Sequence, residues 1–302
     1  MDCNCQGLTV RIMFIRHGFS CANMLKETGM LSNISKAFLY DPPLTNHAIR
    51  DITSVRNGVQ KKLGRPDVVF ASTLLRAQQT ANFLFPDQTV FVAPYIKELG
   101  STLDNKPNTP DIQKKIDLKS KQIYNSNSVV DGKELQKVDE TWRTNYTFVM
   151  GRESSEACVR NSQVSWDEAQ DVNYNKFIFW LEQVLPCMIK LNRVKVKDNT
   201  ITVGVVGHSS FMAKYIETLE VGKKQKPNNV GIVELYFCLS QSNDGKYLFN
   251  KINQNCGCPG IQTLKTLSPN DRRKNCNGVV FSGFPLPKNL SRFSGDNCKI
   301  LT

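Results

Sequence analysis

The sequence predicts an α/β protein with a largely parallel sheet and helices on both of its faces. Three features predict this class: short apolar runs rich in β-branched and aromatic residues, segments with helical spacing of apolar residues between them, and polar or Gly/Pro breaks at their junctions. The 302 residues suffice for one large domain with insertions, or for two small domains.

The first strand and the first helix are marked by clear boundaries. Residues 10–15 form an apolar run that ends abruptly at the charged tripeptide Arg16-His17-Gly18, as a buried strand does at the rim of a sheet. Thr45 is expected to cap a helix, because Ala48 and the apolar residues after it recur at helical spacing. The Gly64-Arg65-Pro66 break ends that helix.

The pattern then repeats, and it is followed by a polar stretch. Residues 67–71 and 89–92 are expected strands, with a helix at 74–85 between them. Residues 100–165 are rich in Asn, Lys, Ser and Asp, with weak helical signals near 112–124 and 141–150. A segment of this length between strands is expected to form a polar cap or lid.

The second half of the chain returns to regular elements. They are a helix at 166–191, a strand at 201–207, a helix at 209–219, and β segments at 230–239 and 247–252. Residues 255–302 are rich in Gly, Pro, Asn, Lys and Cys, which predicts an irregular tail. We therefore expect one domain at 1–254, carrying the insertion at about 100–165, and a C-terminal tail at 255–302.

Composition restricts the class of protein. Hydrophobic residues make up 40% of the chain and charged residues 22%, as in an ordinary globular protein. No apolar run approaches the ~20 residues of a membrane span, so no membrane span is expected. The first residues lack the basic and apolar regions of a signal peptide, which predicts a cytoplasmic location.

The net charge of +12 predicts attraction to anions. Basic clusters at 223–226 and 272–274 are too short, and too poor in aromatic residues, to predict specific nucleic-acid binding. A phosphorylated small molecule or phosphoprotein is the expected partner. The sequence assigns no oligomeric state.

The chain has ten cysteines, and free thiols are the default expectation for a cytoplasmic protein. Cysteines 3 and 5, and cysteines 256 and 258, form C-x-C pairs, whereas structural zinc sites prefer C-x₂₋₄-C spacing. A zinc site and disulfides in the tail are the alternatives.

Two of the three histidines follow apolar strands. His17 follows the run at 10–15, and His208 follows the run at 201–207, whereas His47 lies near an expected helix start and is interpreted as an ordinary exposed residue. A histidine at the carboxyl end of a strand lies where α/β sheets bind ligands, and it can act as a nucleophile. The adjacent Arg16 can hold an anionic group.

Five segments in order along the chain resemble the motifs of the histidine phosphatase (phosphoglycerate mutase-like) superfamily. The segments are RHGFSCAN at 16–23, DPPLT at 41–45, STLLRAQQTA at 72–81, the acidic residue Glu98, and VVGHS at 205–209. The resemblance runs from about residue 10 to 240, apart from the insertion. It implies branch 1 of the superfamily and a phosphoglycerate mutase-like, three-layer α/β/α sandwich with a mostly parallel central sheet.

The resemblance also implies a metal-independent phosphatase that works without a cofactor. His17 would attack phosphorus and form a phosphohistidine intermediate, and Glu98 would serve as acid and then base. His208 completes the catalytic set and, if protonated, adds a positive charge. Substrate phosphate would be bound by Arg16, Asn23, Arg76 and the backbone N–H of Ser209.

Some roles have alternatives. The alternative to phosphate contact for Asn23 is to cap a helix or turn. For Ser20, local hydrogen bonding that holds the loop is as good an interpretation as contact with phosphate. The alternatives to Glu98 as the acid are Asp104 and a carboxylate of the insertion.

Departures from the family patterns favour hydrolysis. Phe19 stands where mutases commonly have Glu or Gln, and Glu98 is not followed by the W-x-G of glycolytic mutases. Ala48 and Ser209 stand where many members have glycine. His208 is not followed by Asp, which separates the chain from the acid phosphatases and phytases. We therefore expect a phosphoric monoester hydrolase. The alternatives are a mutase-type phosphotransferase, a non-catalytic phospho-ligand binder, and a nucleic-acid or membrane-surface binder attracted by charge alone.

Overall fold

The computed structural model describes most of the sheet and its covering helices. The described residues are 5, 7–27, 39–126, 164, 168, 170–218, 227–243, 247–251, 278–281, 283–284 and 298. The helical segment expected at 141–150 lies outside them, as do most of the insertion after residue 126 and most of the tail.

The strands and helices lie close to the segments expected from the sequence. The strands are β1 (Leu8–Arg16), β2 (Val68–Ala71), β3 (Val90–Val92), β4 (Thr200–Gly207), β5 (Ile232–Gln241), β6 (Tyr247–Lys251) and β7 (Gly278–Phe281). The helices are α1 (Cys21–Glu27), α3 (Asn46–Leu63), α4 (Leu75–Leu84), α5 (Pro110–Ser126), α9 (Tyr174–Lys190) and α10 (Ser209–Thr218), with a 3₁₀ turn η1 (Leu103–Asn105). The short helix α1 was not expected, and α5 fits the helical signal near 112–124.

The sheet is mixed, so the expectation of a mostly parallel sheet is wrong. Its strand order is β3-β2-β4-β1-β5-β6, and β7 also pairs with β5. β1, β2, β3 and β4 pair in parallel, whereas β5 runs antiparallel to β1, β6 and β7. A short connection joins β5 to β6, and so short a link permits only antiparallel pairing. Through β7, part of the segment 255–302 belongs to this sheet.

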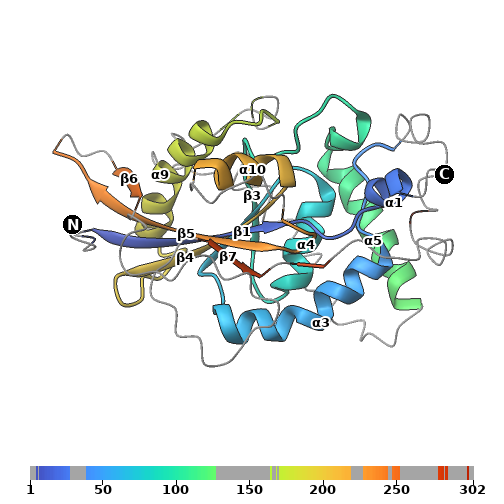
Figure 1. Ribbon diagram of the computed structural model, residues 1–302, viewed down its shortest axis with the longest axis horizontal. Helices are drawn as coiled ribbons and strands as arrows, with labels where there is room; N and C mark the ends of the chain where they lie inside the picture. Colours follow the sequence, from blue (N-terminus) through green and yellow to red (C-terminus); the bar gives the residue numbers. More distant parts are fainter. Residues whose placement is uncertain are drawn as a thin grey trace.

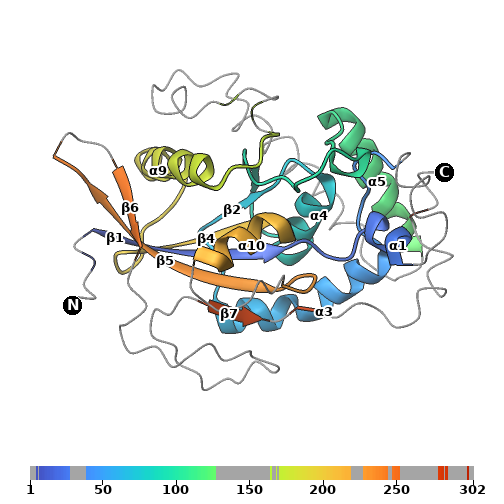
Figure 2. The same cartoon turned by 45° about the horizontal axis from the view of Figure 1, so that its top comes forward.

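Helices cover both faces of the sheet because side chains alternate along each buried strand. On β1, Ile12 and Phe14 belong to the apolar cluster that includes α9 and α10 residues, whereas Met13 and Ile15 belong to the cluster that includes α3 and α4 residues. Figure 1 shows α9 and α10 above the sheet and α3 below it, and Figure 2 shows the same arrangement after a 45° turn.

Caps set two of the helix starts. The Thr45 side chain accepts a hydrogen bond from the backbone N–H of Ala48 at 3.1 Å, which confirms Thr45 as the cap of α3. The helix expected from residue 166 instead begins at Tyr174, because Asn173 caps it and donates its backbone N–H to Tyr95 O. Within the described part of the chain, no helix is both long and apolar enough to cross a bilayer.

In the part of the chain that the structure describes, disulfides join distant segments, so the expectation of free thiols is wrong for these cysteines. Cys5 is bonded to Cys238 on β5, and Cys21 at the start of α1 is bonded to Cys298. Disulfides persist in oxidising compartments and are rare in the cytosol. The two bonds therefore argue against the cytoplasmic location expected from the sequence.

Candidate active site

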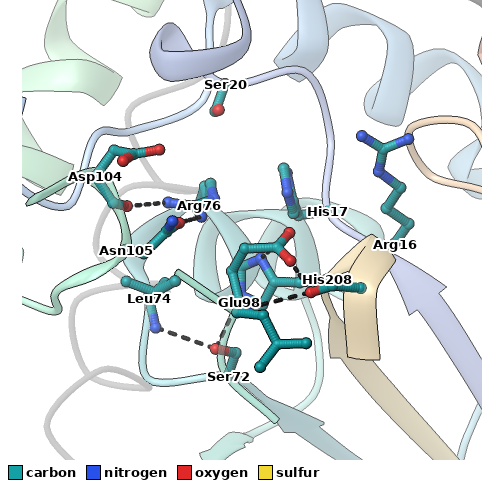
Figure 3. A network of polar contacts seen from close by, with 12 residues as sticks. Arg16, His17, Ser20, Ser72, Leu74, Arg76, Glu98, Asp104, Asn105 and His208 are labelled. Carbon is teal, nitrogen blue, oxygen red and sulfur yellow. Dashed lines mark hydrogen bonds and ion pairs between the residues drawn. The ribbon is translucent and has the colours of Figure 1, made fainter. Parts of the chain in front are cut away.

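The two strand-end histidines meet at one edge of the sheet. β1 and β4 are parallel neighbours in which Arg16 pairs with Gly207, so the residues that follow them lie side by side. The backbone N–H of His17 donates to Gly207 O at 2.9 Å, and the imidazole ring centroids of His17 and His208 are 4.9 Å apart. Figure 3 shows Arg76 and Glu98 beside this pair.

His17 is oriented as a nucleophile. Its Nδ1 lies 2.6 Å from Gly18 O, a carbonyl that can only accept, so the proton belongs on Nδ1 and Nε2 keeps its lone pair. The side chain is buried. Burial, followed by the charges of Arg76 and Arg16, holds the pKa of His17 well below 6.5, so the imidazole is neutral near neutral pH.

Gly18 lets the loop after β1 lie directly on α3. A Cβ added there would come within 3.0 Å of Ile52 Cδ1 and 3.3 Å of Ala48 Cβ. The Gly18 N–H donates to Thr80 Oγ1 on α4 at 3.0 Å. The loop after β1 is thus fixed between two helices that cover the same face of the sheet.

Arg76 points into the site from the first turn of α4. It is buried, and its guanidinium donates to Asp104 O at 2.6 Å and to Asn105 Oδ1 at 2.9 Å. Both acceptors belong to η1, within the segment that the sequence assigned to the insertion. The insertion therefore contributes the contacts that aim Arg76.

The buried carboxyl group of Asp41 holds the start of α4. Asp41, in the DPPLT segment, accepts hydrogen bonds from the backbone N–H groups of Leu75 at 2.8 Å and Asn108 at 2.9 Å, and from the Gln113 side chain. Burial raises the pKa of Asp41 to about 6, although these hydrogen bonds oppose the shift. Asp41 links α4 to α5 and explains why an acid stands in this motif.

Asn105→Ala is expected to lower kcat/KM about 10- to 100-fold, because a small displacement of an oriented group costs that much. The substitution removes one of two acceptors that fix the Arg76 guanidinium. Asn105→Asp keeps an acceptor and should restore most of the loss. Steady-state kinetics with a thermal unfolding control test this, and wild-type kinetics in Asn105→Ala would contradict it.

Arg16 supplies a second guanidinium. It is the last residue of β1, and its Nη1 donates to Pro227 O at 2.7 Å. The charges of Arg16 and Arg76 act on one another and on His17. The buried Arg76 and the half-buried Arg16, beside a neutral imidazole, form a site suited to a doubly charged phosphoryl group.

Glu98 and His208 lie next to each other and close to His17. His208 is fully buried, with Nε2 3.0 Å from Ser72 Oγ and Nδ1 3.8 Å from Glu98 Oε2. The other Glu98 oxygen accepts a hydrogen bond from the Ser210 hydroxyl. These contacts place the carboxylate near both imidazoles, whereas Asp104 lies with η1 beside Arg76.

The charge states of Glu98 and His208 follow from their burial. Burial raises the pKa of Glu98, although Arg76 and Arg16 oppose the shift, so the carboxyl holds its proton to higher pH than usual. Burial and the nearby cations hold the pKa of His208 well below 6.5. His208 is therefore neutral without a bound anion, which does not support the extra positive charge considered from the sequence.

The other predicted residues lie on flanking elements. Asn23 Oδ1 on α1 accepts hydrogen bonds from the Ser20 N–H at 3.2 Å and the Ser20 hydroxyl at 3.0 Å, so its carbonyl end holds the loop. Ser209 begins α10, where backbone N–H groups have no partner within the helix. His47 pairs with Asp51 on α3 at 3.2 Å, which fits an ordinary role.

Sequence reasoning missed three supporting residues. Ser72 lies in the recognised STLLRAQQTA segment but had no role, and its hydroxyl also accepts from the Leu74 N–H at 3.3 Å. Ser210 follows the second histidine and fixes Glu98. Asn105 lies in the polar insertion, where no local pattern indicates a contact with Arg76.

No protein-family model and no curated protein matches the sequence. Solved structures similar to this chain include phosphoglycerate mutase from Bacillus anthracis, with 17% identity over 81% of this chain and 93% of that chain, and a TM-score of 0.40. Phosphoserine phosphatase from Entamoeba histolytica has 16% identity over 80% and 95%, with a TM-score of 0.35. A mycobacterial glucosyl-3-phosphoglycerate phosphatase has 14% identity over 80% and 98%, with a TM-score of 0.38.

These solved structures are members of the superfamily that the five sequence motifs resemble. Their identities and TM-scores are too low to carry an assignment of reaction or substrate. That assignment depends on the motifs and on the geometry described above.

Proposed function

We propose that this protein is a metal-independent phosphatase of the histidine phosphatase type, which hydrolyses a phosphomonoester through a phosphohistidine on His17. One observation carries the proposal: His17 lies with its Nε2 lone pair available, beside the buried Arg76, the half-buried Arg16 and the Glu98 carboxyl group. Helices on both faces of the sheet also fit the three-layer sandwich of that superfamily.

In the first step, His17 Nε2 attacks phosphorus and the bond from phosphorus to the leaving oxygen breaks. Glu98 gives its proton to that oxygen, which leaves as an alcohol. Arg16 and Arg76 stabilise the charge on the equatorial oxygens, and the N–H of Ser209 adds a donor.

In the second step, water attacks the phosphohistidine and the bond from phosphorus to Nε2 breaks. Glu98, now a carboxylate, takes a proton from the water, and inorganic phosphate leaves. His17 returns to neutral imidazole, with its Nδ1 proton held by Gly18 O throughout. His208 stays beside the reacting group as a hydrogen-bonding partner oriented by Ser72.

The proposed substrate is a phosphorylated small molecule or a phosphoprotein. The N–H and guanidinium donors around His17 recognise the phosphoryl group itself rather than the group that carries it. Specificity would come from the insertion, which already supplies the partners of Arg76. Phe19 is buried in the apolar cluster that includes α3 and α4 residues, so its ring is not expected to contact the substrate.

The pH dependence of kcat/KM follows from two opposite requirements. His17 must be neutral, so activity rises as the pH increases through its lowered pKa. Glu98 must carry a proton, so activity falls as the pH increases through its raised pKa. We expect a maximum on the acidic side of neutrality and loss of the alkaline limb in Glu98→Gln. An alkaline limb that persists unchanged in that variant would rule out Glu98 as the acid.

The proposal is tested by p-nitrophenyl phosphate hydrolysis in excess EDTA, combined with trapping of the intermediate. Wild-type protein should turn over the substrate and, when quenched, carry phosphate in an acid-labile, base-stable linkage typical of phosphohistidine. Activity that disappears with EDTA and returns with a metal would contradict the proposal. A base-labile, acid-stable phosphoprotein would move the intermediate to a different side chain.

A further inference from the structure

Three side chains at the centre of the site form a compact set of metal-ligating atoms. His17, Glu98 and His208 each offer one nitrogen or oxygen, and these atoms all lie within 4.8 Å of one another. Small side-chain adjustments would bring them to the 2.0–2.2 Å ligand distances of zinc. Two histidines and one glutamate are a common set for zinc with an open coordination position.

The second polar atom of each side chain has a partner. His17 Nδ1 bonds to Gly18 O, which leaves Nε2 for a ligand. His208 Nε2 lies 3.0 Å from Ser72 Oγ, whereas its buried Nδ1 has no hydrogen-bond partner among the described residues. Glu98 Oε1 accepts from Ser210, and Oε2 faces His208 Nδ1.

This arrangement is the outer shell that metal-binding residues require. A metal-ligating histidine usually donates its second N–H to a carbonyl or hydroxyl, which fixes the tautomer and the ring orientation. His17 and His208 have such partners in Gly18 O and Ser72 Oγ. The three ligands therefore need no new supporting contacts to bind an ion.

We infer that the pocket binds a single Zn²⁺ ion through His17, Glu98 and His208, and that the bound ion inhibits the enzyme. The ion takes up the lone pair of His17 Nε2, so that the nitrogen cannot attack phosphorus. Arg16 and Arg76 repel a dication, but they attract an anion such as chloride, which fills the open coordination position of the zinc ion. The binding claim is independent of the proposed function, and the inhibition claim rests on it.

Metal-free protein titrated with Co²⁺, a spectroscopic substitute for Zn²⁺, tests the binding directly. Wild type should develop a visible absorption band that saturates at one Co²⁺ per chain and is displaced by Zn²⁺. His208→Ala and Glu98→Gln should weaken Co²⁺ binding at least tenfold. Ser72→Ala, which removes only the outer partner of His208, should weaken it about 10- to 100-fold.

His47→Ala is the matched control, because His47 belongs to a histidine–carboxylate pair on α3. It should bind Co²⁺ as wild type does. Circular dichroism should confirm that each variant is folded. No saturable band in wild type, or a band lost equally in His47→Ala, would overturn the inferred site.

Activity measurements separate this inference from the proposed function. Zn²⁺ should inhibit hydrolysis in competition with substrate, and EDTA should restore it. Hydrolysis without Co²⁺ binding would overturn only the metal site. Co²⁺ binding without hydrolysis would support the site and contradict the proposed phosphatase activity.

Discussion

His17→Ala is expected to lower kcat/KM for p-nitrophenyl phosphate, measured with EDTA present, by about 10⁴-fold or more. The substitution removes the atom that forms the bond to phosphorus in the proposed mechanism. Arg16, Arg76 and Glu98 stay in place, because their hydrogen bonds to Pro227, to η1 and to Ser210 do not involve the imidazole. Substrate binding should therefore survive better than turnover, with the loss in kcat rather than KM.

Two controls make the His17→Ala result decisive. His47→Ala, on α3, should keep wild-type kinetics. The His17→Ala protein should keep the wild-type unfolding temperature to within a few degrees, which separates lost chemistry from lost structure. Substantial turnover by folded His17→Ala would refute the covalent mechanism. No turnover by folded wild type would favour a strict mutase or a phospho-ligand binder, and phosphoglycerates would be tested next.

Removal of one disulfide by Cys5→Ser/Cys238→Ser is expected to lower the free energy of unfolding by about 2–5 kcal/mol. The bond closes a loop with a sequence separation of 233 residues, and it holds the chain before β1 against β5. Without it, the unfolded chain gains conformational freedom that the native protein does not share. Guanidinium denaturation of wild type and variant, both without reductant, measures the difference.

Reduced wild-type protein is the matched comparison for this prediction. It also loses Cys21–Cys298, with a separation of 277 residues, so it should be less stable than the double variant. Equal stability of the oxidised wild type and the double variant would contradict the assigned bond. Mass spectrometry of the unreduced digest would identify the two pairings directly.

The positions of the main residues of the candidate site follow from local patterns. β-branched runs predict β1 and β4, and the carboxyl ends of parallel neighbours necessarily meet. This argument places each histidine at the edge of the sheet, and the structure adds that β1 and β4 are neighbours, which brings His17 beside His208. Arg76 is predictable for a similar reason, because it lies in the first turn of the helix that follows β2.

Other parts of the site depend on contacts between distant segments. Asn105 reaches Arg76 from a polar stretch whose sequence has no helical or strand period at that point. Ten cysteines allow many pairings, so spacing does not predict that Cys21 joins Cys298. The reversal of β5 was missed because strand patterns predict burial, not direction.

The bond between Cys21 and Cys298 also sets an order of events during synthesis. Cys21 immediately follows Ser20 in the loop after His17, yet its partner lies 277 residues further along the chain. At ribosomal rates of about 5–20 residues per second, about 15–55 seconds pass between the two cysteines. Throughout that interval the thiol of Cys21 is open to reaction with cysteines that are already synthesised, such as Cys5. Correct attachment of the loop after His17 is therefore a late step of maturation, and a disulfide isomerase is expected to increase the yield of correctly folded protein.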